Sequence, residues 1–183
     1  MVSFAEEDME RLDWQLLRDS SVSVYCDQDT LTQHLRQLIE DGYAVVEFEC
    51  GELTGAGLAI ALSAALGRPI TGRGSYLDVL DDIFYDPARL RANIPTPGGL
   101  VLVLRGFDSF TTAHEHDAAA VLSILDGHSR AALMLGLRWI VIVQVSDPDF
   151  AFVPLQLEIK LNFDEAAARA NSLVDWASVL GEP

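Results

Sequence analysis

Two runs of consecutive aliphatic residues constrain the fold of this chain more than any other feature. They are GLVLVLRGF (99–107) and RWIVIVQV (138–145). Strands that are apolar at every position are buried on both faces, as central strands of a parallel sheet are. Between them, residues from Asp117 to near Leu135 have a helical pattern that Gly136 would end. Parallel neighbours need such a crossover, so the chain is predicted to fold as an α/β protein.

The same alternation of strand and helix precedes these runs. SVSVYC (21–26) is predicted to be a strand, followed by a helix that stops at Gly42. YAVVEFEC (43–50) is a second strand, and its helix runs roughly from Thr54 to Leu66. We expect the apolar runs near residues 43, 99 and 139 to form adjacent or near-adjacent parallel strands, with helices on both faces.

The C-terminal part of the chain has a different pattern. In LQLEIKLNF (155–163), apolar residues alternate with polar ones, which is typical of a half-exposed strand. We place it at a sheet edge, antiparallel to its neighbour, with Pro154 at its start. Asp164 is expected to cap a terminal helix. No Pro/Gly/Ser-rich linker divides the sequence, so residues 1–183 are predicted to form a single domain.

The charge of the chain limits its partners. It has 28 acidic and 12 basic residues, a formal net charge of −16. Such a surface repels nucleic acid and anionic lipid, and it attracts basic proteins at long range. The start of the sequence lacks the basic and apolar regions of a signal peptide, and Cys26 and Cys50 are expected to be reduced thiols. The longest uncharged apolar stretch (53–67) is too short to span a bilayer. A cytoplasmic protein is predicted.

The most informative segment is GSYLDVLDDIFYD (74–86). Ser75 is a good helix N-cap, and Asp78 completes a Ser-x-x-Asp capping box. Winding the segment at about 100° per residue gives one broad apolar arc and one acidic face. The apolar arc consists of Tyr76, Leu77, Val79, Leu80, Ile83 and Phe84. The acidic face consists of Asp78, Asp81, Asp82 and Tyr85, with Asp86 at its margin.

Two interpretations of this acidic face are open. Runs of charge are usually solvated surfaces, and Asp78 near the helix N-terminus interacts well with the helix dipole. A row of carboxylates beside an exposed tyrosine is also a good receptor for arginine and lysine side chains, through charge-assisted hydrogen bonds.

The order of motifs resembles the barstar family of intracellular ribonuclease inhibitors, in particular its longer bacterial members. The motifs are AVVEFEC, LAIALSAALGRP, GSYLDVLDDIF, GLVLVLRGFDSF, AAAVLSIL and WIVIVQV. The most specific part is the Leu-Asp-x-Leu-x-Asp pattern at 77–82, followed one segment later by LVLRGFD (102–108). The resemblance covers roughly residues 43–146. It implies a small parallel sheet packed by helices, with an additional N-terminal βα segment (1–42) and a C-terminal extension (147–183).

The resemblance also implies an inhibitor whose acidic helix and preceding loop block a ribonuclease active site. By analogy Asp78 and Asp82 face the partner and imitate substrate phosphates, and Asp81, nearer the apolar arc, matters less. The family commonly has a pair of aromatic residues before the glycine of that loop, whereas this loop carries Arg73 before Gly74. Tyr76 or Tyr85 would then supply the aromatic contact. Asp126 is the nearest candidate for a further family acid on the last core helix.

Two other motifs point to small ligands. Gly51, Gly55 and Gly57 follow a strand, but they lack the dinucleotide fingerprint and a Walker lysine, so they are better explained as easing a turn. His114 and His116 alternate and could chelate Zn²⁺, yet no second ligand cluster accompanies them. We therefore expect no cofactor and no catalytic metal.

Three functions remain open at this point. The first is a non-enzymatic inhibitor or immunity protein for a basic ribonuclease or nuclease toxin. The second is a phosphoester hydrolase that holds a divalent metal on Asp78, Asp81 and Asp82, although such sites usually take ligands from several elements. The third is an adaptor that keeps the fold without the inhibitory surface.

Overall fold

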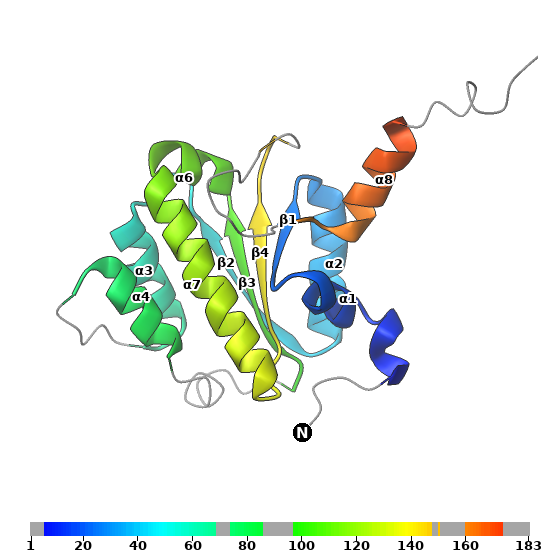
Figure 1. Cartoon of the computed structure of the whole chain (residues 1–183), viewed down its shortest axis with the longest axis horizontal. Coiled ribbons are helices and arrows are strands. Elements are labelled where there is room, and N and C mark those ends of the chain that lie inside the picture. Colours follow the sequence, from blue (N-terminus) through cyan, green and yellow to red (C-terminus); the bar gives the residue numbers. More distant parts are fainter. Residues whose placement is uncertain (1–5, 69–73, 86–96, 148–149, 151–159, 174–183) are drawn as a thin grey trace, which may run out of the picture.

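The computed structural model describes residues 6–68, 74–85, 97–147, 150 and 160–173. Within them the chain folds as an α/β protein around one parallel sheet with strand order β2-β3-β4-β1-β5 (Figure 1). The strands are β1 (Val22–Tyr25), β2 (Tyr43–Glu49), β3 (Gly99–Arg105), β4 (Trp139–Gln144) and β5 (Lys160–Leu161). Strands β2, β3 and β4 are adjacent and parallel, which confirms the prediction from the apolar runs.

The central strands are covered on both sides because their side chains alternate between two apolar layers. In β3, Leu100, Leu102 and Leu104 belong to one hydrophobic cluster, whereas Val101 and Val103 belong to the other. All five are at most 5% exposed. A strand buried in this way has no polar face, which is why its sequence shows no alternation.

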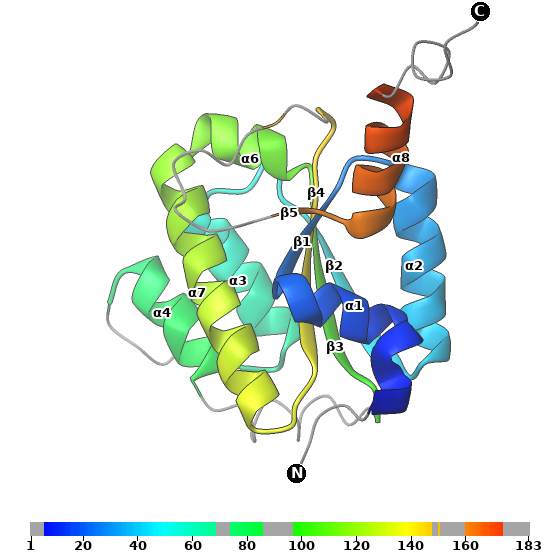
Figure 2. The ribbon, with the colours of Figure 1, turned by 45° about the vertical axis from the view of Figure 1, so that its right-hand side comes forward.

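Helices cover both faces, as Figures 1 and 2 show. One layer contains α3 (Gly55–Ala65), α4 (Tyr76–Phe84), α6 (Phe107–Ala113) and α7 (Glu115–Met134). The other contains α1 (Leu12–Asp19) and α2 (Gln28–Glu40). The short 3-10 helix η1 (Glu6–Glu10) precedes α1, and α8 (Phe163–Leu173) follows β5. No helix among the described residues is both long and apolar enough to cross a membrane.

The end of β3 differs from the prediction. The strand stops at Arg105, because Gly106 adopts a left-handed conformation (φ 62°) and turns the chain into α6. Sequence patterning did not predict α6, whose Phe107 and Phe110 are fully buried. Helix α7 begins at Glu115, two residues before Asp117, and Gly136 (φ 76°) follows its end as expected.

The C-terminal strand also needs a correction. Strand β5 lies at the sheet edge as predicted, but it pairs parallel to β1, not antiparallel. Alternating polarity indicates a half-exposed strand without specifying its direction, which depends on how the chain crosses from β4 past β1. The predicted portion before Lys160 lies outside the described residues. Helix α8 is capped by Asn162 rather than Asp164, because the Asn162 Oδ1 accepts from the backbone N–H groups of Asp164 and Glu165.

Candidate functional site

Helix α4 packs against α3 and α7 through the apolar arc that the sequence predicted (Figure 1). Its side chains Val79, Leu80, Ile83 and Phe84 are buried. The centroid of the Phe84 ring lies 4.4 Å from that of the Trp139 ring at the start of β4. This contact fixes the C-terminal end of the helix on the sheet. The opposite face of α4 is consequently held outward.

Asp78 lies on this outward face and also stabilises the start of the helix. Its Oδ2 accepts hydrogen bonds from the Ser75 backbone N–H (2.8 Å) and hydroxyl (2.9 Å). The Ser75 hydroxyl oxygen accepts in turn from the Asp78 N–H, so the predicted capping box is confirmed. A Cβ at Gly74 would come within 2.6 Å of the same Oδ2, so a glycine leaves room for this arrangement. The Asp78 Oδ1 has no partner among the described residues.

Asp82 and Tyr85 are the least engaged side chains of the helix. Both are exposed, Tyr85 to 77%. Within the described part of the chain, neither the Asp82 carboxylate nor the Tyr85 hydroxyl has a hydrogen-bond or ionic partner. Arg68 approaches this end of the helix, but its Nη2 donates to the backbone carbonyl of Asp82 (3.2 Å), not to the carboxylate. The Asp82 carboxylate is therefore available to an external cation.

Asp81 is tied to the neighbouring helix. Its Oδ1 lies 2.7 Å from Nε2 of His128 on α7, and a proton on that nitrogen makes the histidine the donor. The histidine ring also packs against Phe84, with centroids 5.9 Å apart. Sequence patterns could not reveal this pair, because its members are 47 positions apart. Asp81, like Asp78, thus already has an internal partner.

Tyr76 points into the protein, unlike Tyr85. Its ring fits against α3 at Gly55, where a Cβ would come within 2.6 Å of a ring carbon. The hydroxyl is buried and makes no well-formed hydrogen bond within the described residues, although the Asp117 carboxylate lies beside it. Burial and that carboxylate raise the pKa of Tyr76 to about 12. Tyr85 is therefore the aromatic side chain that α4 exposes.

The remaining sequence candidates do not join the acidic face within the described part of the chain. Arg73 falls outside the described residues. Asp126 is buried on α7, where it accepts a hydrogen bond from the Ser21 hydroxyl and pairs with Arg130, so it does not extend the acidic face. In the described ranges no three His, Cys, Asp or Glu side chains are grouped as metal ligands would be, and His114 and His116 gain no third ligand.

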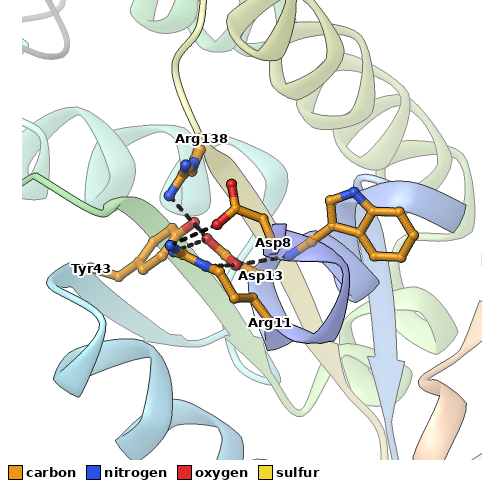
Figure 3. Close-up of polar contacts among 6 residues, drawn as sticks. Asp8, Arg11, Asp13, Tyr43 and Arg138 are labelled. Carbon is orange, nitrogen blue, oxygen red and sulfur yellow. Dashed lines mark hydrogen bonds and ion pairs between the residues drawn. The ribbon is translucent and has the colours of Figure 1, made fainter. Parts of the chain in front are cut away.

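A second carboxylate centre, which was not predicted from the sequence, lies on the other face of the sheet. Asp13 in α1 is fully buried and accepts hydrogen bonds from the Tyr43 hydroxyl (2.6 Å) and from Arg11 Nη2 (2.8 Å) (Figure 3). Arg138 Nη1, from the loop before β4, approaches the same oxygen at 3.3 Å. Burial alone would raise the pKa of Asp13, but these hydrogen bonds and charges outweigh it and lower the pKa.

The Asp13 cluster stabilises the packing of distant elements and does not form a binding surface. It connects α1 to β2 and to the loop before β4, and its carboxylate is enclosed by cations of the same chain. The sequence did contain a signal, because Asp13 stands among the buried residues Leu12, Leu16 and Leu17 of α1. An acid in an apolar stripe indicates an internal partner.

No family model matches this sequence, and no curated protein matches it either. The geometry of α4 and its surroundings is therefore the basis for a function.

Proposed function

We propose that this protein is a barstar-like inhibitor that binds a basic ribonuclease or nuclease toxin through the outward face of α4 and the loop before it. The observation that carries the proposal is the pair Asp82 and Tyr85, exposed on a packed helix without an internal partner among the described residues. Asp78 adds a second carboxylate one turn earlier, with one oxygen still unused.

The rigidity of α4 supports this function. The capping box fixes its first turn, the Phe84–Trp139 contact fixes its last turn, and the Asp81–His128 pair connects it to α7. A helix backbone anchored in this way loses little further freedom when a partner binds, which favours affinity. A merely solvated acidic helix does not need three such anchors.

The chemistry of the face fits a cationic active site. Ribonucleases bind phosphate groups with lysine, arginine and histidine side chains, and carboxylates on α4 would occupy the positions of those phosphates. The net charge of −16 would steer a basic partner toward the protein before contact. The exposed Tyr85 ring would stack on an arginine or pack against the rim of the active site.

The proposal is tested by capturing a basic nuclease from the native host and measuring both binding and inhibition. Asp82→Ala should weaken binding by about 2–5 kcal/mol, because the opposing cation would be left desolvated and unpaired. Asp78→Ala should weaken it comparably, and Asp81→Ala less. Surface plasmon resonance gives the dissociation constants, and RNA cleavage by the captured enzyme gives the inhibition.

Asp29→Ala is the matched control, since Asp29 is also an exposed aspartate in the first turn of a helix, but on α2. It should alter mainly the association rate, and added salt should slow association of every variant. Equal affinities for Asp82→Ala, Asp78→Ala and Asp29→Ala would show that the acidic helix is not the binding surface. A captured nuclease whose activity is unaffected would contradict inhibition.

A further inference from the structure

A hollow of about 350 Å³ lies between the end of α1, the start of β1 and the last turns of α7. Its lining residues are Leu17, Arg18, Ser20, Ser21, Ser129, Arg130, Leu133 and Met134. None of them belongs to the acidic face of α4. The size is within the range of small-molecule sites.

Arg130 presents unused hydrogen-bond donors at this hollow. Its Nε lies 3.0 and 2.9 Å from the two carboxylate oxygens of Asp126, which is itself held by the Ser21 hydroxyl. The guanidinium is therefore fixed by one edge. Its two terminal nitrogens have no partner among the described residues, and the side chain is 65% exposed. Such a fork matches the geometry of a carboxylate or phosphate group.

Two further side chains add to this site. Arg18 brings a second guanidinium, which lies 5.0 Å from the centre of the Trp14 ring. The hydroxyl of Ser20, a residue only 9% exposed, accepts from the Val22 N–H at 3.2 Å. Its own hydrogen has no acceptor among the described residues, so it remains available to a ligand oxygen. In a chain of 12 basic and 28 acidic residues, a hollow lined by two arginines is unusual.

The rest of the lining is apolar. Leu17 and Leu133 form part of the wall, and Met134 stands at the rim with 88% of its surface exposed. A flexible methionine can cover ligands of varied shape. Charged donors at one part of a hollow and aliphatic side chains at another suit an amphiphilic molecule.

A purely structural explanation accounts for only some of these features. Cationic side chains near the ends of α1 and α7 interact favourably with the helix dipoles. That explains why arginines are placed here. It does not explain why two nitrogens of Arg130 and the hydroxyl hydrogen of Ser20 lack partners in the described part of the chain, or why Met134 is exposed beside them.

We propose that this hollow binds a small organic anion, with a carboxylate or phosphate head on Arg130, Arg18 and Ser20 and a short apolar chain against Leu17, Leu133 and Met134. This site is independent of the inhibitor function proposed for α4.

The probes are hexanoate and hexyl phosphate, titrated into the full-length, ¹⁵N-labelled protein and followed by backbone amide chemical shifts. We expect saturable shifts confined to residues around Ser20, Ser21 and Arg130. Hexylammonium, which has the same chain and the opposite charge, should cause none. A response to only one of the two anions identifies which head group the site takes.

Arg130→Gln should weaken anion binding about tenfold, the effect of losing charge-assisted hydrogen bonds. Because this substitution also leaves Asp126 with one partner fewer, Met134→Asp provides a second variant at an exposed position and should abolish binding by repulsion. Arg36→Gln, which removes an exposed arginine from α2, is the matched control and should bind like the wild type. Absence of saturable shifts, or shifts unchanged by both Arg130→Gln and Met134→Asp, would overturn the proposal.

Discussion

Asp13 and Asp82 are the same residue type in two opposite environments. Asp13 lies in the layer of α1 and α2, fully buried, with a tyrosine and two arginines around its carboxylate. Asp82 lies in the layer of α3, α4 and α7, exposed, without a partner for its carboxylate among the described residues. Enclosure by fixed cations makes the first a part of the fold. Exposure on an anchored helix makes the second available for binding.

The role of an acidic residue in this protein depends on its surroundings and not on the net charge of the chain. The net charge of −16 describes the whole surface and selects no residue. Asp13, Asp78, Asp81 and Asp82 differ in whether the carboxylate already has a partner within the protein. Asp13 is fully engaged, Asp81 pairs with His128, and Asp78 shares its carboxylate with Ser75. The Asp82 carboxylate has no partner within the described ranges. Substitutions should therefore reduce stability most at Asp13 and least at Asp82, and should weaken partner binding most at Asp82.

The largest expected effect on stability is at Asp13. Asp13→Ala should lower the free energy of unfolding by about 3 kcal/mol, because it leaves the Tyr43 hydroxyl and two guanidinium groups without their acceptor. Urea unfolding followed by circular dichroism at neutral pH measures this. Asp82→Ala should change the same quantity by less than about 0.5 kcal/mol. Similar losses for the two variants would break the comparison.

The second prediction concerns acid. The pKa of Asp13 is lowered from its ordinary value near 3.8, so its carboxylate stabilises the fold above that pH. This contribution should be lost as the pH falls below about 4, toward the lowered pKa of the folded state. In Asp13→Asn, which cannot titrate, the stability should fall less steeply over that range than in the wild type. Parallel curves from pH 5 to pH 2 would show that Asp13 does not contribute to acid sensitivity.

A smaller effect on stability is expected at Asp78, whose carboxylate caps the helix and is also proposed to bind the partner. Asp78→Ala removes one half of the capping box and should cost about 1 kcal/mol of stability. Asp78→Asn retains an acceptor oxygen for Ser75 and should cost less, while still lacking the charge that a basic partner would need. Thermal unfolding of the two variants separates the structural role from the ionic one. Full stability in Asp78→Ala would mean that the cap does not hold α4.

A still smaller effect on stability than at Asp78 is expected at the Asp81–His128 pair. The Asp81 side chain is 56% exposed, so the ion pair is screened by solvent. His128→Gln should therefore change the free energy of unfolding by less than about 1 kcal/mol, and the change should be smaller in high salt. A double-mutant cycle with Asp81→Asn measures the coupling energy directly. A coupling energy well above 1 kcal/mol would show that Asp81, like Asp13, mainly stabilises the folded state.

Much of the fold followed from the sequence because its signals are local. The all-apolar pattern of residues 99–105 and 139–144 requires burial on both faces, and the structure places both strands in the interior of the parallel sheet. The Ser75–Asp78 capping box and the two faces of α4 likewise depend on spacing within one helix. Gly106 marks where such patterns fail, since its left-handed turn ends β3 and starts the unpredicted α6.

The sequence by itself therefore determined the α/β class, the parallel central strands, the apolar side of α4 and the set of acids on its outer side. Only the tertiary structure decided which of those acids is engaged, that Tyr76 faces inward while Tyr85 faces solvent, and that β5 runs parallel to β1. The reason is physical. Backbone periodicity records which face of an element is buried, but the partner of a side chain depends on how distant elements pack, as His128 does for Asp81 and Arg138 for Asp13.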